Sequence, residues 1–138
     1  NSANQPLTIV VNQHKRPING GSYSGFNPAE ATSRVIFPLI MDRNSGWWTG
    51  FNLQNVGSSN TTVSCTFTNT SYTIPATVLQ PGQALNALQN NAIGSGYIGS
   101  ATCTATGGDA KIIGVVNEAR VGGTSDQLMT YEGINVTP

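Results

Sequence analysis

The sequence predicts an all-β protein, mainly an antiparallel two-sheet sandwich. Short runs of alternating apolar and polar residues recur from residue 34 onward, and Gly, Asn, Ser or Pro bounds each run. No stretch shows a convincing 3.6-residue helical period. A chain of 138 residues is long enough to bury one hydrophobic core. We therefore expect a single sandwich domain over residues 34–138.

The first 33 residues stand apart from this domain. Residues 6–12 alternate as a strand, with Leu7, Ile9 and Val11 on one face. Residues 13–33 are rich in Gly, Asn, Ser and Pro and show no regular period, which indicates a long loop or linker. The sequence therefore predicts an N-terminal strand on a long linker.

Eight strands are expected within the sandwich domain. They lie near residues 34–41, 47–55, 61–68, 72–79, 83–89, 97–106, 110–118 and 127–136. Turn residues separate most of them, which is typical of antiparallel strands joined by short connections. This pattern favours an immunoglobulin-like sandwich, with a Greek-key barrel or a jelly roll as the alternatives.

Two cysteines, Cys65 and Cys103, occur in Thr-rich alternating runs, at positions whose side chains should point inward. One disulfide between them is predicted, with two separate buried thiols as the alternative. A disulfide is typical of oxidising compartments. We therefore expect a secreted protein, extracellular or at the cell surface. The start at Asn1 rather than Met fits either removal of a secretory signal or an arbitrary boundary of the sequence.

Several short motifs resemble those of a family of secreted bacterial β-sandwich domains. They are FPLIM at residues 37–41, GWWTGF at 46–51, LQNVG at 53–57, LQPGQ at 79–83, GSA at 99–101, VNE at 116–118 and YEG at 131–133. These are turn and core positions rather than reactive groups. The resemblance covers about residues 34–138 and implies extracellular or cell-surface residence without a defined activity.

The composition leaves little material for chemistry. Only 9% of the residues are charged, the formal net charge is zero, and His14 is the single histidine. Acid–base catalysis, metal binding and phosphate recognition all rely on such side chains. We therefore expect no enzyme, no catalytic residue, no metal, no cofactor and no nucleic acid partner. The longest apolar run is far shorter than the roughly 20 residues that span a bilayer, so we also expect no membrane span.

The N-terminal strand suggests a mode of assembly. An apolar strand on a tether can pair within its own molecule or with an open sheet edge of a neighbour. In the second case the subunit-contact residues would be Leu7, Ile9, Val10 and Val11, and copies of the chain would form a homopolymer. The expected function is a structural subunit of an extracellular bacterial filament or pilus, assembled by strand exchange between subunits.

Trp48 indicates an alternative function. Trp47 and Trp48 are successive strand positions, so Trp47 should point inward and Trp48 outward beside Asn52 and Gln54. An outward indole next to two amides suits stacking on a sugar or a subunit contact, unless a loop covers it. The alternative is therefore a carbohydrate-binding or adhesive module of a secreted cell-surface protein, with surface glycans as its partners.

Two further residues are candidate modification sites. Asn60 and Asn69 begin Asn-x-Ser/Thr triplets at or near predicted turns. We expect them to be available for glycosylation in a compartment where that reaction occurs.

Overall fold

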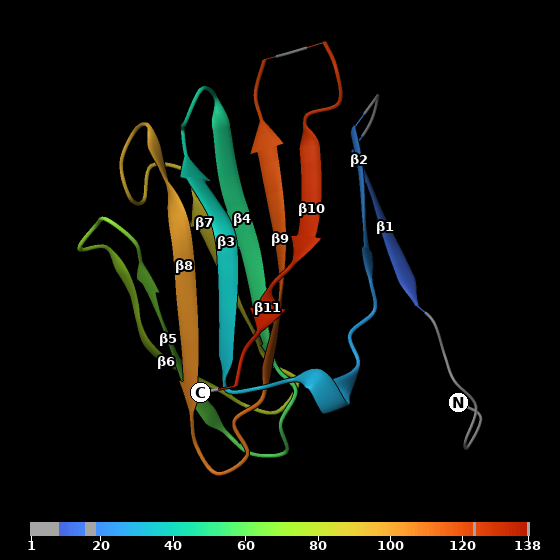
Figure 1. Ribbon diagram of the computed structural model, residues 1–138, viewed down its shortest axis with the longest axis vertical. Coiled ribbons are helices and arrows are strands. Elements are labelled where there is room, and N and C mark those ends of the chain that lie inside the picture. Colours follow the sequence, from blue (N-terminus) through green and yellow to red (C-terminus); the bar gives the residue numbers. More distant parts are fainter. Residues whose placement is uncertain (1–8, 16–18, 123, 138) are drawn as a thin grey trace.

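The computed structural model describes residues 9–15, 19–122 and 124–137, and it is almost entirely β (Figure 1). The strands are β1 (Val10–Lys15), β2 (Asn19–Ser24), β3 (Arg34–Asp42), β4 (Trp47–Asn55), β5 (Thr61–Phe67), β6 (Thr73–Leu79), β7 (Ala84–Gln89), β8 (Tyr97–Thr106), β9 (Ile112–Arg120), β10 (Leu128–Glu132) and β11 (Ile134–Asn135). A short 3-10 helix, η1 (Pro28–Glu30), precedes β3. The predicted all-β class is confirmed.

Two antiparallel sheets pack face to face as a β-sandwich. One has four strands in the order β10-β9-β4-β7, and the other has five in the order β11-β3-β8-β5-β6. Their inner faces share one apolar core, in which the rings of Phe37 and Phe51 lie 4.7 Å apart between centroids. Seven of the eight predicted strands are found within two residues of their expected bounds.

The eighth predicted strand, residues 127–136, is wrong as a single strand. β10 pairs with β9 in the four-stranded sheet, whereas β11 pairs with β3 in the other sheet. The chain changes sheets at Gly133, where a Cβ atom would overlap the ring of Phe37. A residue without a side chain is therefore needed for the backbone to cross the end of the core.

The N-terminal region contains more regular structure than a linker. Of the predicted strand at residues 6–12, residues 6–8 lie outside the described residues, and β1 continues to Lys15. β1 pairs with β2 as an antiparallel hairpin. In Figure 1 this hairpin lies beside β10, outside the sandwich. The expectation of a loop throughout residues 13–33 is therefore wrong, since tertiary contacts order part of that stretch.

The predicted disulfide is confirmed. Cys65 of β5 and Cys103 of β8 are buried, directly opposite each other in the sheet, and bonded. The bond joins two neighbouring strands of the five-stranded sheet. Within the described part of the chain, no helix is long and apolar enough to cross a membrane.

Candidate ligand-binding groove

The outer face of the four-stranded sheet carries the residues that the sequence singled out. Alternation along β4 buries Phe51 and Leu53 in the core and turns Trp48, Asn52 and Gln54 to the opposite face. The structure thus brings the three predicted contact residues together on one surface.

Neighbouring strands extend this surface with more uncharged side chains. In the sheet register, Asn52 lies opposite Asn86 of β7, and Gly50 lies opposite Leu88 of β7 and Asn117 of β9. Amides from three strands therefore lie on this face in two neighbouring cross-strand rows, Asn86–Asn52–Val115 and Leu88–Gly50–Asn117. Leu88 is 55% exposed and adds apolar surface to this face.

The β1–β2 hairpin forms a third layer beside one part of this face. The backbone N–H of Gln127 donates to the side-chain carbonyl of Asn19 at 2.7 Å, and the N–H of Ser24 donates to the carboxylate of Glu132 at 2.6 Å. Between these bonds, β2 approaches β10 closely at Gly21. These contacts attach the hairpin to the β10 side of the sheet, and Asn52, Gln54 and Leu88 stay exposed.

A groove runs between the hairpin and the sheet. It consists of two hollows of about 410 and 390 Å³ that share Gln13 and Asn52. We call their union the outer groove. Its lining residues are Val11, Gln13, Tyr23, Gly25, Phe26, Trp48, Gly50, Phe51, Asn52, Gln54, Ala84, Asn86, Ala87, Leu88, Ile113, Gly114, Val115, Asn117, Ala119 and Leu128. None is charged, so the groove offers amides and apolar surface and has no fixed charge of its own.

Trp48 and Leu88 form an apolar platform at one end of the outer groove. A Cβ atom built on Gly50 would lie 3.9 Å from the indole of Trp48 and 3.8 Å from the side chain of Leu88. Both side chains therefore flank the bare backbone of Gly50. The indole Nε1 is buried and has no hydrogen-bond partner within the described residues.

The predicted subunit-contact residues are only partly described. Leu7 lies outside the described residues. Ile9 and Val10 are 57% and 61% exposed, while Val11 is half-buried in the outer groove. Within the described residues, β1 pairs with β2 of its own chain. Exchange of the N-terminal strand between subunits stays a prediction.

Sequence reasoning missed a buried polar row on the inner side of the same sheet. Thr49 donates its hydroxyl hydrogen to the carboxylate of Glu118, with oxygen distances of 2.7 and 2.8 Å. Burial raises the pKa of Glu118 to about 7, although the Thr49 hydrogen bond acts in the opposite direction. Gln89 is also fully buried in this row, opposite Thr49, and its amide has no partner in the described structure. Alternation along β9 could have shown that Glu118 points into the core.

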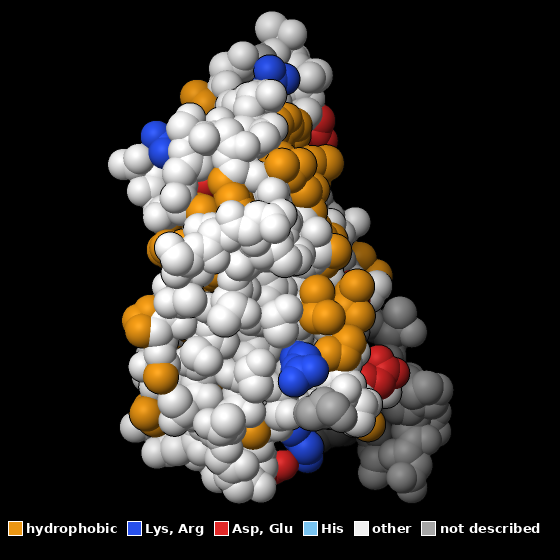
Figure 2. All heavy atoms as spheres, turned by 60° about the vertical axis from the view of Figure 1, so that its left-hand side comes forward, with side chains coloured by type: hydrophobic (Ala, Val, Ile, Leu, Met, Phe, Trp, Pro, Cys, Tyr) orange, Lys and Arg blue, Asp and Glu red, His pale blue; other side chains and the backbone are white. Residues whose placement is uncertain are grey.

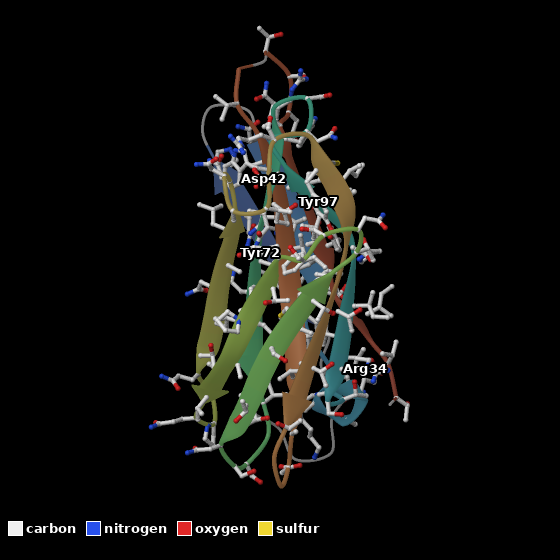
Figure 3. The ribbon with its side chains drawn as sticks, turned by 90° about the vertical axis from the view of Figure 1, so that its left-hand side faces the viewer. Arg34, Asp42, Tyr72 and Tyr97 are labelled. Atoms are coloured by element: carbon white, nitrogen blue, oxygen red, sulfur yellow. A yellow bond between two sulfur atoms is a disulfide. The ribbon has the colours of Figure 1, made fainter. Side chains whose placement is uncertain are left out.

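Another carboxylate, Asp42, has a structural role at one end of the sandwich (Figure 3). Burial alone would raise its pKa, but N–H donors from Asn91, Ile93 and Gly94 at 2.7–3.0 Å lower it to about 2. The ionised carboxylate thus fixes the loop before β8. Among the described residues, no group of three or more His, Cys, Asp or Glu side chains could hold a metal ion.

The outer face of the five-stranded sheet is different in character. In β5, Thr62, Ser64 and Thr66 lie opposite Thr106, Thr104 and Thr102 of β8. We call these six residues the Ser/Thr face. Figure 2 shows mainly uncharged polar side chains and backbone over the middle of this side of the molecule, with few charged groups.

The candidate glycosylation residues lie at the surface. Asn60 is exposed just before β5, and Asn69 is exposed in the turn that follows β5. Both are accessible, and their modification stays a prediction.

Comparisons with known proteins give a fold and no family. No protein-family model and no curated protein matches the sequence. The chain is similar to a solved structure described as "Crystal Structure of Thermotoga maritima 1070", with a TM-score of 0.55 and 16% sequence identity. The match covers 75% of this chain and 94% of that chain. At this identity the similarity concerns the fold alone.

Proposed function

We propose that the protein is a carbohydrate-binding, adhesive module of a secreted cell-surface protein and that the outer groove binds the glycan. One observation carries the proposal. The groove combines an aromatic platform with amide side chains from three neighbouring strands, and no charged side chain lines it.

The amides suit a ligand made of hydroxyl groups. Each Asn or Gln side chain both donates and accepts hydrogen bonds, as a sugar hydroxyl does. Asn52, Asn86 and Asn117 lie on adjacent strands, so one ligand can contact several of them at once. A site that hydrogen-bonds a ligand in this way rejects analogues that would leave its amides unpaired.

The platform supplies the apolar part of the contact. One face of a sugar ring presents C–H groups, which pack well against a large aromatic side chain. Trp48 and Leu88 flank the bare Gly50 and leave a surface on which such a ring can lie. A neutral groove also binds a neutral ligand without the cost of removing charges from water.

Placement outside the cell is part of the same proposal. The Cys65–Cys103 disulfide is typical of oxidising compartments. The resemblance of residues 34–138 to secreted bacterial sandwich domains supports both this placement and an immunoglobulin-like arrangement of the strands.

The test is binding to a glycan array and to insoluble polysaccharides, with Trp48→Ala compared with the wild type. We expect wild-type binding to at least one neutral glycan and at least tenfold weaker binding by Trp48→Ala. Val78→Ala is the matched control, because Val78 is a 59% exposed apolar residue on β6 of the other sheet. Absence of wild-type binding, or equal binding by Trp48→Ala, would contradict the proposal.

A second candidate is the filament subunit, which the exposed start of β1 favours. Ile9 and Val10 present apolar side chains to solvent, and β1 has a strand partner on only one side in the described structure. Such an edge can pair with another chain. Removing residues 1–12 should then convert filaments into monomers, as seen by electron microscopy. Filaments that persist after the deletion would exclude strand exchange.

A further inference from the structure

We infer that the outer groove binds an internal stretch of a linear, uncharged polysaccharide that lies along β4, rather than the end of a glycan chain. This inference rests on the proposed function and narrows its ligand. It depends on the length of the groove, the order of its lining residues and the nature of its walls.

The groove is longer than the predicted contact residues suggest. A third hollow, of about 480 Å³, shares Gly25, Phe26 and Ile113 with it and continues to η1. The stretch of β4 from Trp48 to Gln54 alone spans about 20 Å at the rise of an extended strand. A depression this long accommodates several consecutive sugar units.

Apolar and amide surfaces follow one another along this path. The Trp48–Leu88 platform comes first, then the paired amides of Asn52 and Asn86, and then Gln54 close to Tyr23 and Phe26. Each unit of a linear polysaccharide presents both a C–H face and a hydroxyl edge. A repeating ligand of this kind finds both types of partner at each end of the groove.

β1 contributes Val11 and Gln13 to the lining of the groove, and within the described residues its edge away from β2 has no strand partner. The N–H of Gly25 donates to the carbonyl of Ile9, and this bond shows which alternate residues of β1 direct their backbone N–H and C=O groups toward β2. By alternation, the backbone groups of Val10, Asn12 and His14 point away from β2. Their N–H and C=O groups form a regular row of donors and acceptors, while the side chain of Val11 faces the groove.

Charge selects against acidic polymers. The charged side chains that line the continuation of the groove are those of Glu30 and Glu132, in the third hollow. A polyanionic glycan would bring like charges together there, which is unfavourable. An extended peptide could also lie along β1, but a neutral polysaccharide uses the Trp48 platform and the floor amides together.

The test is calorimetric titration with two neutral series, cello-oligosaccharides and chito-oligosaccharides of one to six units. We expect the affinity in at least one series to rise with length well beyond two units. Asn52→Ala, at the centre, should weaken short and long ligands alike. Phe26→Ala and the milder Phe26→Leu, at the far end from Trp48, should weaken only the longest ligands, by about tenfold for Phe26→Ala, and Val78→Ala should change nothing.

The outcomes separate the two proposals. If no saccharide and no insoluble polysaccharide binds, the proposed function itself fails. If saccharides bind but the affinity stops rising after one or two units, or if both Phe26 variants affect all lengths equally, the groove holds a chain end and the inference is wrong. Tighter binding of alginate or of an uncharged extended peptide would also overturn it.

Discussion

The two sheets of the sandwich share one core and differ in their cross-links, their buried polar residues and their outer surfaces. The five-stranded sheet is cross-linked by the Cys65–Cys103 disulfide, and its outer side carries the Ser/Thr face. The four-stranded sheet has the buried polar residue Glu118 on its inner side, and on its outer side it carries amides, Trp48 and a third layer. The covalent cross-link lies in one sheet, and the candidate binding groups lie in the other.

This division shows how a protein with few charged residues can still be specialised. Short β-branched and hydroxyl side chains suit a regular, rigid sheet surface. Larger aromatic and amide side chains are placed where a hollow exists beneath the hairpin. The five-stranded sheet is therefore interpreted as the scaffold and the four-stranded sheet as the binding sheet. The predictions below that include saccharide affinity test that assignment.

The largest effect is expected from removing the disulfide. The double variant Cys65→Ala/Cys103→Ala should lower the free energy of unfolding by about 4 kcal/mol, because the bond closes a loop with a sequence separation of 38. Urea denaturation measures the loss. Saccharide affinity of the folded variant should stay unchanged, since the bond lies in the scaffold sheet. A folded variant that no longer binds would contradict the division between the sheets.

A pH-dependent effect is expected from Glu118 in the binding sheet. Its pKa is about 7 in the folded protein, against an ordinary value of 4.5 for a solvated Glu, so the folded state binds the proton more tightly than the unfolded state. Protonated Glu118 therefore adds about 3 kcal/mol to the free energy of unfolding. This contribution is fully present below pH 4.5 and is lost as the pH rises through about 7. Glu118→Gln should remove this dependence.

Urea denaturation at pH 5 and pH 8 measures the contribution of Glu118. We expect wild type to lose stability over this interval, and Glu118→Gln to lose much less, because its amide stays neutral and can still accept the hydrogen bond from Thr49. Equal pH dependence in the two proteins would show that this carboxylate is not the group responsible.

A smaller effect, confined to the third layer, is expected from Gly21. Gly21→Ala would place a Cβ atom against the Thr130 hydroxyl and should push the hairpin from the sheet, at a cost of about 1–3 kcal/mol. Hydrogen exchange should then be faster in β2, and saccharide affinity should fall. Gly20→Ala is the matched control, because its Cβ atom would meet only the Gln13 carbonyl, at an ordinary 3.7 Å. Equal behaviour of the two variants would contradict the role of the close approach.

Gly21 also shows where sequence reasoning could not succeed. The strands of the sandwich were predictable because each alternates apolar and polar residues between turn residues. In β2 the side that faces β10 contains a glycine, and the reason is a contact with Thr130, more than one hundred residues away in the sequence. Hydrophobic periodicity cannot identify such a strand, because a glycine contributes no apolar side chain to the alternating pattern.

The candidate groove was predictable to a similar extent. Strand alternation was enough to place Trp48, Asn52 and Gln54 on one face. It could not supply Asn86 and Leu88, because their position beside β4 depends on the strand order β9-β4-β7. The hairpin wall depends in turn on β2. The local sequence pattern thus predicts which residues share one face of a strand. Predicting a site assembled from several strands also requires the order of the strands in the sheet.

The smallest effect is expected from the Ser/Thr face. Thr104→Val on β8 keeps the side-chain shape and the β-branch while removing a hydroxyl from the partly exposed surface. We expect a change in the free energy of unfolding below about 0.5 kcal/mol by urea denaturation, as for most surface substitutions. Saccharide affinity should also be unchanged, whereas Asn52→Ala on the binding sheet should weaken it. If Thr104→Val weakens saccharide binding instead, the Ser/Thr face contacts the ligand, and the scaffold sheet has a binding role as well.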